Sequence, residues 1–287
     1  MARYRNLISL VIITTVVVTT FLVAHYRKAV PDLGELNQVT ELPEDVKDVL
    51  SWPVPKSIRI PILMYHYVEY VTDKRDTIRQ SLDILPGTFT AQIDTLKKAG
   101  FTFITPVDLA LSLTGVMELP AKPVILSFDD GYRDFYTDVF PIIKKENVRV
   151  VAYLVPGFLD RPNYMFTSQV KEIASSGLVE IGAHTMHHVW LKGLNTAQAS
   201  YEINESRKAL RRLTGQPVNS FAYPYGAFDK KTAGLVEKAG FMDAVSTVRG
   251  VDQSRENEYF WFRVRPGSLT GEALVNLLTK TKFAALY

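Results

Sequence analysis

Two clusters of polar side chains in this sequence have the types and spacing of a metal-dependent hydrolytic site. Asp129 and Asp130 come directly after one apolar run, and His184 and His188 follow another. One carboxylate and two imidazoles can hold a divalent metal ion, and the second carboxylate is then free to act as a base towards an activated water molecule. The sequence therefore predicts metal-assisted hydrolysis.

Each cluster also has a simpler interpretation. Asp-Asp-Gly is a common turn, and a His-x-x-x-His pair is often a solvated helix face. However, three of the five histidines in the chain lie within residues 184–188, and this clustering favours metal binding. His187 is the competing ligand. On a helical turn it would point about 100° away from His184, whereas His188 would share the face of His184.

These motifs resemble those of the polysaccharide deacetylase family, the fourth family of carbohydrate esterases, which removes N- or O-acetyl groups from sugar polymers. The family's first motif, Thr/Ser-Phe-Asp-Asp-Gly, is matched by residues 127–131. Its second motif, His-Ser/Thr-x-x-His, is matched by residues 184–188. The resemblance covers roughly residues 58–270.

The resemblance implies a role for each of these polar residues. Asp130, His184 and His188 would bind one divalent metal ion, and Asp129 would act as the general base. Histidine and aspartate ligands suit zinc, and cobalt, nickel or iron could occupy the same site.

The third family motif is matched only in part. Pro224 and Tyr225 occupy its proline and aromatic positions, so the backbone N–H of Tyr225 is the candidate oxyanion donor. Ala222 stands where the family usually has the arginine that orients the base. Arg263 or Arg265 could replace that arginine, although surface charge is an equally simple interpretation of both.

The family's general acid is a histidine near the C-terminus, but no histidine follows His188 in this chain. His66 ends an early apolar run, and the subgroup that deacetylates poly-β-1,6-N-acetylglucosamine is circularly permuted so that this segment comes first. His66 is therefore the expected acid, the alternative being a core histidine at a strand end. Tyr132, Trp190 and Pro224 are candidate substrate-binding residues, although aromatic side chains in such loops often serve only packing.

Apolar runs that are typical of strands alternate with amphipathic stretches that are typical of helices. The strand-like runs are 58–66, 102–105, 124–128, 150–155, 178–183, 220–223 and 244–248, and helical examples are 90–99, 197–213 and 230–239. The alternation predicts an α/β fold whose parallel strands are covered by helices, with the active site at the strand C-termini if the sheet closes into a barrel. The resemblance implies a distorted (β/α)7-type barrel, whereas strand counting alone also allows an eightfold barrel or an open doubly wound sheet.

The N-terminal part differs from the rest. Leu7–Ala24 is an uncharged run of eighteen residues flanked by basic residues, which just suffices to span a bilayer as a helix. We predict a signal anchor in residues 1–25, a linker in 26–57 and the deacetylase domain in 58–287. The domain is then membrane-anchored and extracytoplasmic, and secretion after signal cleavage is the alternative.

Composition narrows the range of functions. The chain has 287 residues, 47% of them hydrophobic and 22% charged, as expected of a folded enzyme with one large core. A net charge of +3 with scattered basic residues gives no indication of nucleic-acid binding. The absence of cysteine excludes disulfides and thiolate metal ligands.

The expected activity is removal of N-acetyl groups from an extracellular polysaccharide that contains N-acetylglucosamine, with poly-β-1,6-N-acetylglucosamine as the first candidate. Peptidoglycan, chitooligosaccharides and O-acetylated xylan are alternative substrates. Two hypotheses come from other classes of protein. One is a non-haem iron oxygenase, which also uses a carboxylate and two histidines. The other is an inactive, membrane-tethered carbohydrate-binding module.

Overall fold

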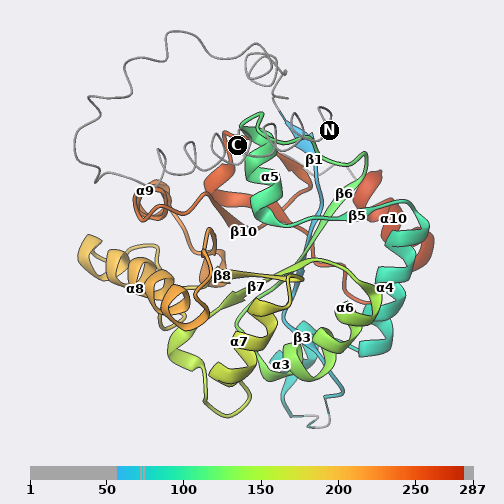
Figure 1. The fold of residues 1–287 in the computed structure, drawn as a ribbon, viewed down its shortest axis with the longest axis horizontal. Coiled ribbons are helices and arrows are strands. Elements are labelled where there is room, and N and C mark those ends of the chain that lie inside the picture. The colour runs from blue at the N-terminus through green and yellow to red at the C-terminus, as the bar shows by residue number, and fades with distance from the viewer. Residues whose placement is uncertain (1–56, 72, 74, 281–287) are drawn as a thin grey trace, which may run out of the picture. The chain divides into compact units, whose positions relative to one another are not determined.

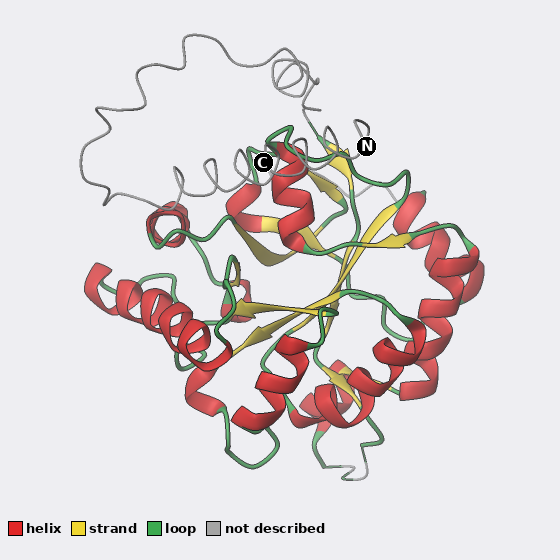
Figure 2. Cartoon of the chain, in the orientation of Figure 1, coloured by secondary structure: helices red, strands yellow, loops and turns green. Residues whose placement is uncertain are grey.

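The computed structural model describes residues 57–71, 73 and 75–280, and its framework is a ring of parallel strands surrounded by helices (Figures 1 and 2). Along the ring the strands follow in the order β12-β10-β9-β8-β7-β6-β2, and each pair of neighbours is parallel. The strands are β2 (Ile62–Tyr65), β6 (Pro123–Phe128), β7 (Val150–Leu154), β8 (Val179–Ala183), β9 (Ser220–Ala222), β10 (Asp243–Arg249) and β12 (Trp261–Arg263).

The two ends of this ring meet at a single residue. Val264, directly after β12, donates its N–H to the carbonyl of Ile62 and accepts from the N–H of Met64, both at 2.9 Å. This pairing is a parallel bridge opposite Leu63 in β2. The result is a nearly closed parallel barrel, which confirms the barrel that was expected from the sequence.

Helices surround the barrel. They are α3 (Thr77–Leu82), α4 (Pro86–Lys98), α5 (Pro106–Leu113), α6 (Phe140–Glu146), α7 (Thr167–Ser175), α8 (Thr196–Thr214), α9 (Lys230–Lys238) and α10 (Gly271–Thr279). One of them, α5, packs its buried residues against the inner side of the strands. Short strands outside the ring are β1 (Ile58–Arg59), β3 (Tyr67–Val68), β4 (Asp83–Ile84), β5 (Thr102–Phe103) and β11 (Asp252–Gln253). Within the part of the chain that the structure describes, no helix is both long and apolar enough to cross a membrane.

Several predicted elements differ in detail from those observed. The single strand expected over residues 58–66 is divided at Pro61 into β1 and β2, because proline has no N–H to give to a sheet. The run at 102–105 forms only the two-residue strand β5. This strand lies outside the ring and pairs with the first two residues of β6. The predicted anchor and linker, residues 1–25 and 26–57, lie outside the described residues apart from residue 57.

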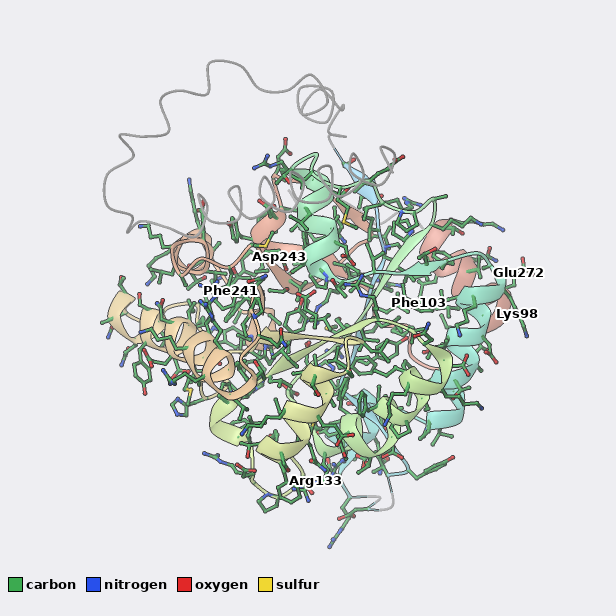
Figure 3. The ribbon with its side chains drawn as sticks, viewed as in Figure 1. Lys98, Phe103, Arg133, Phe241, Asp243 and Glu272 are labelled. Carbon is green, nitrogen blue, oxygen red and sulfur yellow. The ribbon has the colours of Figure 1, made fainter. Side chains whose placement is uncertain are left out.

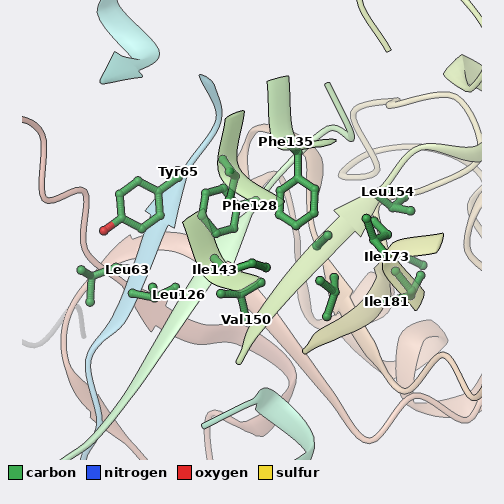
Figure 4. Close-up of a cluster of buried hydrophobic side chains, with 14 of the residues drawn as sticks. Leu63, Tyr65, Leu126, Phe128, Phe135, Ile143, Val150, Leu154, Ile173 and Ile181 are labelled. Atoms are coloured by element: carbon green, nitrogen blue, oxygen red, sulfur yellow. The ribbon is translucent and has the colours of Figure 1, made fainter. Parts of the chain in front are cut away.

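The hydrophobic core has an outer and an inner part. In the outer part, Tyr65 stacks on Phe128 with ring centroids 5.0 Å apart, and Phe128 packs edge-on against Phe135 (Figure 4). Alternate residues of the same strands point into the barrel, where Ile125 of β6 meets Leu109 of α5 in a second buried cluster. The ends of β2 and β6 therefore rest on tightly packed aromatic side chains, directly beneath the polar residues that follow these strands.

Two carboxyl groups, those of Glu180 and Asp243, lie inside the barrel away from those polar residues. Asp243 accepts a short hydrogen bond from Ser220, and Tyr153 lies 2.7 Å from the same serine hydroxyl. Figure 3 shows Asp243 near the ring of strands, whereas Lys98 lies at the periphery. One oxygen of each carboxyl group is buried without a hydrogen-bond partner. Burial raises the pKa of Glu180 to about 7.

This raised pKa predicts that the buried carboxyl of Glu180 makes the free energy of unfolding depend on pH. Between pH ~4.3 and 7 the folded chain keeps a proton on Glu180 that the unfolded chain has lost, so the free energy of unfolding falls as pH rises across this range and levels off above 7. The variant Glu180→Gln removes this dependence. In urea unfolding, its stability relative to the parent protein should increase by about 2–3 kcal/mol between pH 5 and pH 8. Glu118→Gln, at an exposed position, is the control, and a difference that stays constant with pH would contradict the assignment.

Candidate metal-dependent active site

Asp130, His184 and His188 converge at the C-terminal edge of the barrel. One ligand atom from each lies within 4.8 Å of the other two. Oδ1 of Asp130 is 3.3 Å from Nε2 of His184 and 3.1 Å from Nε2 of His188. This oxygen is buried, and neither imidazole approaches it in the geometry of an aligned hydrogen bond. A carboxylate oxygen and two imidazole nitrogens that face one common point fit a divalent metal ion.

The backbone fixes the orientation of the His184 ring. Its Nδ1 lies 2.7 Å from the carbonyl oxygen of Ala222 in β9. A carbonyl can only accept, so Nδ1 carries a proton, and in the neutral ring Nε2 keeps the lone pair that a metal ion needs. Burial alone would lower the pKa of His184, but Asp130 raises it above its ordinary value, so a proton and a metal ion would compete for Nε2.

The candidate site residues follow their strands in unusual backbone conformations. Asp129 and His184 extend the parallel ladder by one residue, donating to the carbonyls of Tyr65 and Leu154 respectively. The chain then turns with positive φ at Asp130, which has a φ of 75°. Positive φ also occurs at Thr185, His188 and Tyr225. Each such residue costs about 1–3 kcal/mol and persists only where its surroundings fix it, as at functional sites.

Residues 184–188 form an irregular turn, not the helical turn on which His187 and His188 were compared. Thr185 has a φ of 61° and His188 a φ of 55°, both in the left-handed region. The turn nevertheless brings the ring of His188 next to that of His184, with centroids 4.9 Å apart. His187 points elsewhere, with its Nδ1 2.9 Å from Oε1 of Glu202. The structure therefore brings His188, and not His187, to Asp130.

Asp129 is held by a buried arginine. Arg263 donates from its two terminal nitrogens to the two oxygens of Asp129, each at 2.7 Å. The guanidinium also donates to the hydroxyl of Ser127 and the carbonyl of Ser246. Burial alone would raise the pKa of Asp129, but the charge and hydrogen bonds of Arg263 bring it below its usual value. Asp129 is therefore ionised at neutral pH, as a general base must be.

Arg263 takes the place of the arginine that the family motif would have at Ala222. Strands β9 and β12 both flank β10, and Val245 of β10 pairs with Ala222 on one side and with Trp261 on the other. Arg263 is two residues beyond Trp261, so it points into the barrel on the same face, one step closer to the site. The alternative candidate, Arg265, is exposed.

His66 follows β2 at the same edge of the barrel. Burial lowers its pKa, and the charges of Asp129 and Asp130 offset part of that effect. The pairing of β2 with β6 places His66 next to Asp129, because Tyr65 pairs with Phe128 and its carbonyl accepts from the N–H of Asp129. Arg263 also acts on His66, in the opposite direction.

Aromatic side chains lie on two sides of the metal-binding group. On one side the ring of Tyr225 is 4.6 Å from that of His188, and Trp190 stacks on Tyr225 at 5.8 Å. Both outer rings are more than half exposed, at 60% for Tyr225 and 56% for Trp190, whereas Pro224 is buried. On the other side Tyr132 stacks on Tyr67 with centroids 3.9 Å apart. Of the three candidate substrate-binding residues, Trp190 thus belongs to an exposed aromatic pair, Tyr132 belongs to a half-buried pair, and Pro224 is buried.

Comparisons with known proteins agree with this arrangement. Residues 117–244 match the family model for polysaccharide deacetylase. The chain is 30% identical over 229 residues to YxkH of Bacillus subtilis (strain 168), a polysaccharide deacetylase-family protein, covering 79% of this chain and 78% of that one. It is 25% identical over 189 residues to the poly-β-1,6-N-acetyl-D-glucosamine N-deacetylase of Staphylococcus aureus (strain MRSA252), covering 61% of this chain and 65% of that one.

A solved structure is similar over most of the described barrel. The Streptococcus pyogenes deacetylase PplD in complex with acetate superposes with a TM-score of 0.70 and 26% identity, covering 78% of this chain and 99% of that one. Fold, site residues and relatives all indicate a hydrolase that acts on acetylated carbohydrate. The chain belongs to the polysaccharide deacetylase family.

Proposed function

We propose that this protein removes N-acetyl groups from a polymer that contains N-acetylglucosamine, with poly-β-1,6-N-acetylglucosamine as the first candidate. The observation that carries the proposal is an ionised Asp129, held by Arg263, directly beside the convergent ligands of Asp130 and the two histidines. The S. aureus relative's name supports this choice of polymer, and this chain spans 65% of that protein's length.

Each residue then has a chemical task. Asp130, His184 and His188 would hold a divalent ion, which would supply Lewis acidity when bound. Asp129 accepts the proton of the attacking water, and the backbone N–H of Tyr225 donates to the developing oxyanion. His66 delivers a proton to the nitrogen of the departing amine, which needs that proton because an unprotonated amide nitrogen is a poor leaving group.

The exposed pair Trp190 and Tyr225 supports a sugar polymer as the substrate. Their stacked rings lead outward from His188, with successive centroids 4.6 and 5.8 Å apart. Broad aromatic faces present apolar surface at low conformational cost. We propose that a sugar next to the reacting residue packs on this pair.

The proposed function is tested by following acetyl loss with mass spectrometry. β-1,6-linked and β-1,4-linked N-acetylglucosamine oligomers and peptidoglycan are compared side by side, each with the chelated protein and after addition of Zn²⁺ or Co²⁺. We expect acetyl loss, fastest on the β-1,6-linked oligomers, that chelation abolishes and metal restores. Full activity after exhaustive removal of metal would overturn the mechanism, and faster turnover of another substrate would overturn the choice of polymer.

His66 gives a separate prediction. His66→Ala should bind metal normally and lose far more activity on N-acetyl amides than on a nitrophenyl acetate, because nitrophenolate departs without being protonated. Loss of general-acid catalysis commonly reduces a rate by about 10²–10⁴-fold. The measurement is kcat/KM on both substrates for the variant and its parent. Equal impairment on both substrates would show that another residue is the acid.

We also propose that residues 1–25 attach the protein to a membrane and that the barrel lies on its extracytoplasmic side. The support is the uncharged run Leu7–Ala24 in the sequence together with the polymeric substrate proposed above. Alkaline washing of isolated membranes tests the attachment, which would be refuted by release of the intact chain. Digestion of intact cells by an external protease tests the sidedness, and a protected barrel would refute it.

A further inference from the structure

Helix α8 is joined to the metal-ligand turn, residues 184–188, through one residue, Glu202. The carbonyl of Glu202 accepts from the N–H of Met186 at 3.1 Å. Its carboxylate accepts from the N–H of His187 at 2.9 Å and lies 2.9 Å from Nδ1 of the same residue. Glu202 is only 8% exposed. A buried carboxylate that makes two contacts with one loop residue restricts both the backbone and the side chain there.

Glu202 contacts the two central residues of the turn, between two residues in an unfavourable backbone conformation. Met186 and His187 lie between Thr185 and His188, the two residues with positive φ. Neither threonine nor histidine adopts that conformation readily, so the surrounding structure must hold it in place. Because Glu202 fixes the two residues in between, it acts on both ends of the turn.

The opposite side of the turn is closed by Gly157. Its N–H donates to the carbonyl of Met186 at 3.0 Å. A Cβ at this position would lie 2.5 Å from that carbonyl oxygen and 2.9 Å from the ring of His187. The turn is therefore held between Glu202 and the backbone of Gly157, which lies so close that residue 157 has no room for a side chain.

We propose that Glu202 is a positioning residue that holds His184 and His188 with their Nε2 atoms towards Asp130 before metal binds. This inference extends the proposed function because it concerns the same metal-binding group, but its test does not require turnover. His187 contributes its main-chain and ring N–H groups to the contacts with Glu202 and lies parallel to Tyr201, with centroids 6.5 Å apart.

The test is a Co²⁺ titration of the metal-free protein and of Glu202→Ala, followed by visible absorption in competition with a chelator. Loss of a group that orients metal ligands typically weakens metal affinity about 10–100-fold, and we expect that loss together with a changed Co²⁺ spectrum. Glu202→Gln should stay within about threefold of the parent, since its amide oxygen can accept from the main-chain N–H of His187 and its NH2 group can donate to Nδ1 in the other tautomer of that ring. Glu205→Ala is the control, because Glu205 lies on the same helix and pairs with Lys208 instead.

Several outcomes decide the matter. Unchanged affinity and spectrum in Glu202→Ala, or an equal loss in Glu205→Ala, would overturn the proposal. If Glu202→Ala does not fold, His187→Ala serves, since it removes only the ring contact and should weaken Co²⁺ binding by a smaller factor; unchanged binding would then overturn the proposal. A protein that behaves as expected in these titrations but deacetylates no substrate would refute the proposed function and leave this inference standing.

Discussion

Replacing Asp129 with asparagine is expected to reduce deacetylation by about 10²–10⁴-fold while leaving the metal in place. The amide keeps the shape of the side chain but cannot accept a proton from water. The loss should fall on kcat, because Asp129 is not among the convergent metal ligands. The measurement combines steady-state kinetics with metal analysis of the purified variant.

Asp130→Asn is the matched comparison, one residue away in the same turn. Its Oδ1 faces both imidazoles, so this substitution should weaken metal binding itself. Excess metal should therefore restore part of the activity of Asp130→Asn and none of the activity of Asp129→Asn. Equal metal loss in the two variants would show that the roles of the aspartates have been assigned wrongly.

The substitution Arg263→Met removes the guanidinium group. It should reduce activity nearly as much as Asp129→Asn does, but for a different reason. It leaves a buried carboxylate without its partner, which typically costs about 3–5 kcal/mol of stability. Burial of Asp129 is then unopposed, so its pKa should rise. A base with a raised pKa is protonated at a higher pH, and the acid limb of the pH–rate profile should move upward.

Urea unfolding and pH–rate profiles measure these two effects separately. The stability that the pair contributes is present above the unfolded pKa of Asp129, about 3.9, and is lost as pH falls through its lower folded value. Arg212→Met is the control, because Arg212 is an exposed arginine on α8. A pH–rate profile in Arg263→Met that matches the parent would mean that Asp129 does not depend on Arg263 for its charge.

The sequence identifies Asp130 and His184 as candidate metal ligands because each lies next to a strand end. Asp130 is two residues beyond β6, and His184 directly follows β8, so recognising the strands is enough to bring them to one edge. The conformation of the turn could not be predicted in this way. Residue types such as Thr185 and His188 do not favour positive φ, and the helical turn that their spacing suggests is absent.

The sequence limits the partner of the base to Arg263 or Arg265 but does not choose between them. Arg263 and Asp129 are 134 residues apart, and their contact depends on the register of β12, a strand of three residues. Nothing local separates Arg263 from Arg265 except which of them faces inward. The sequence gives a weak indication of a role for Glu202. It is a charged residue on the same helix face as Ala199 and Ile203, which are buried in α8.

The closing bridge at Val264 has a consequence for how the enzyme is made. Arg263 enters the barrel only when β12 pairs with β10 and Val264, the residue after Arg263, pairs with β2. During synthesis, a chain that ends before β12 already contains Asp129, Asp130, His184 and His188. It does not yet contain Arg263, the cation that keeps Asp129 charged. Because domains generally complete their folding as units, we expect activity to arise in one step with closure. An unfinished or clipped barrel would then be inactive even where its metal ligands are all present.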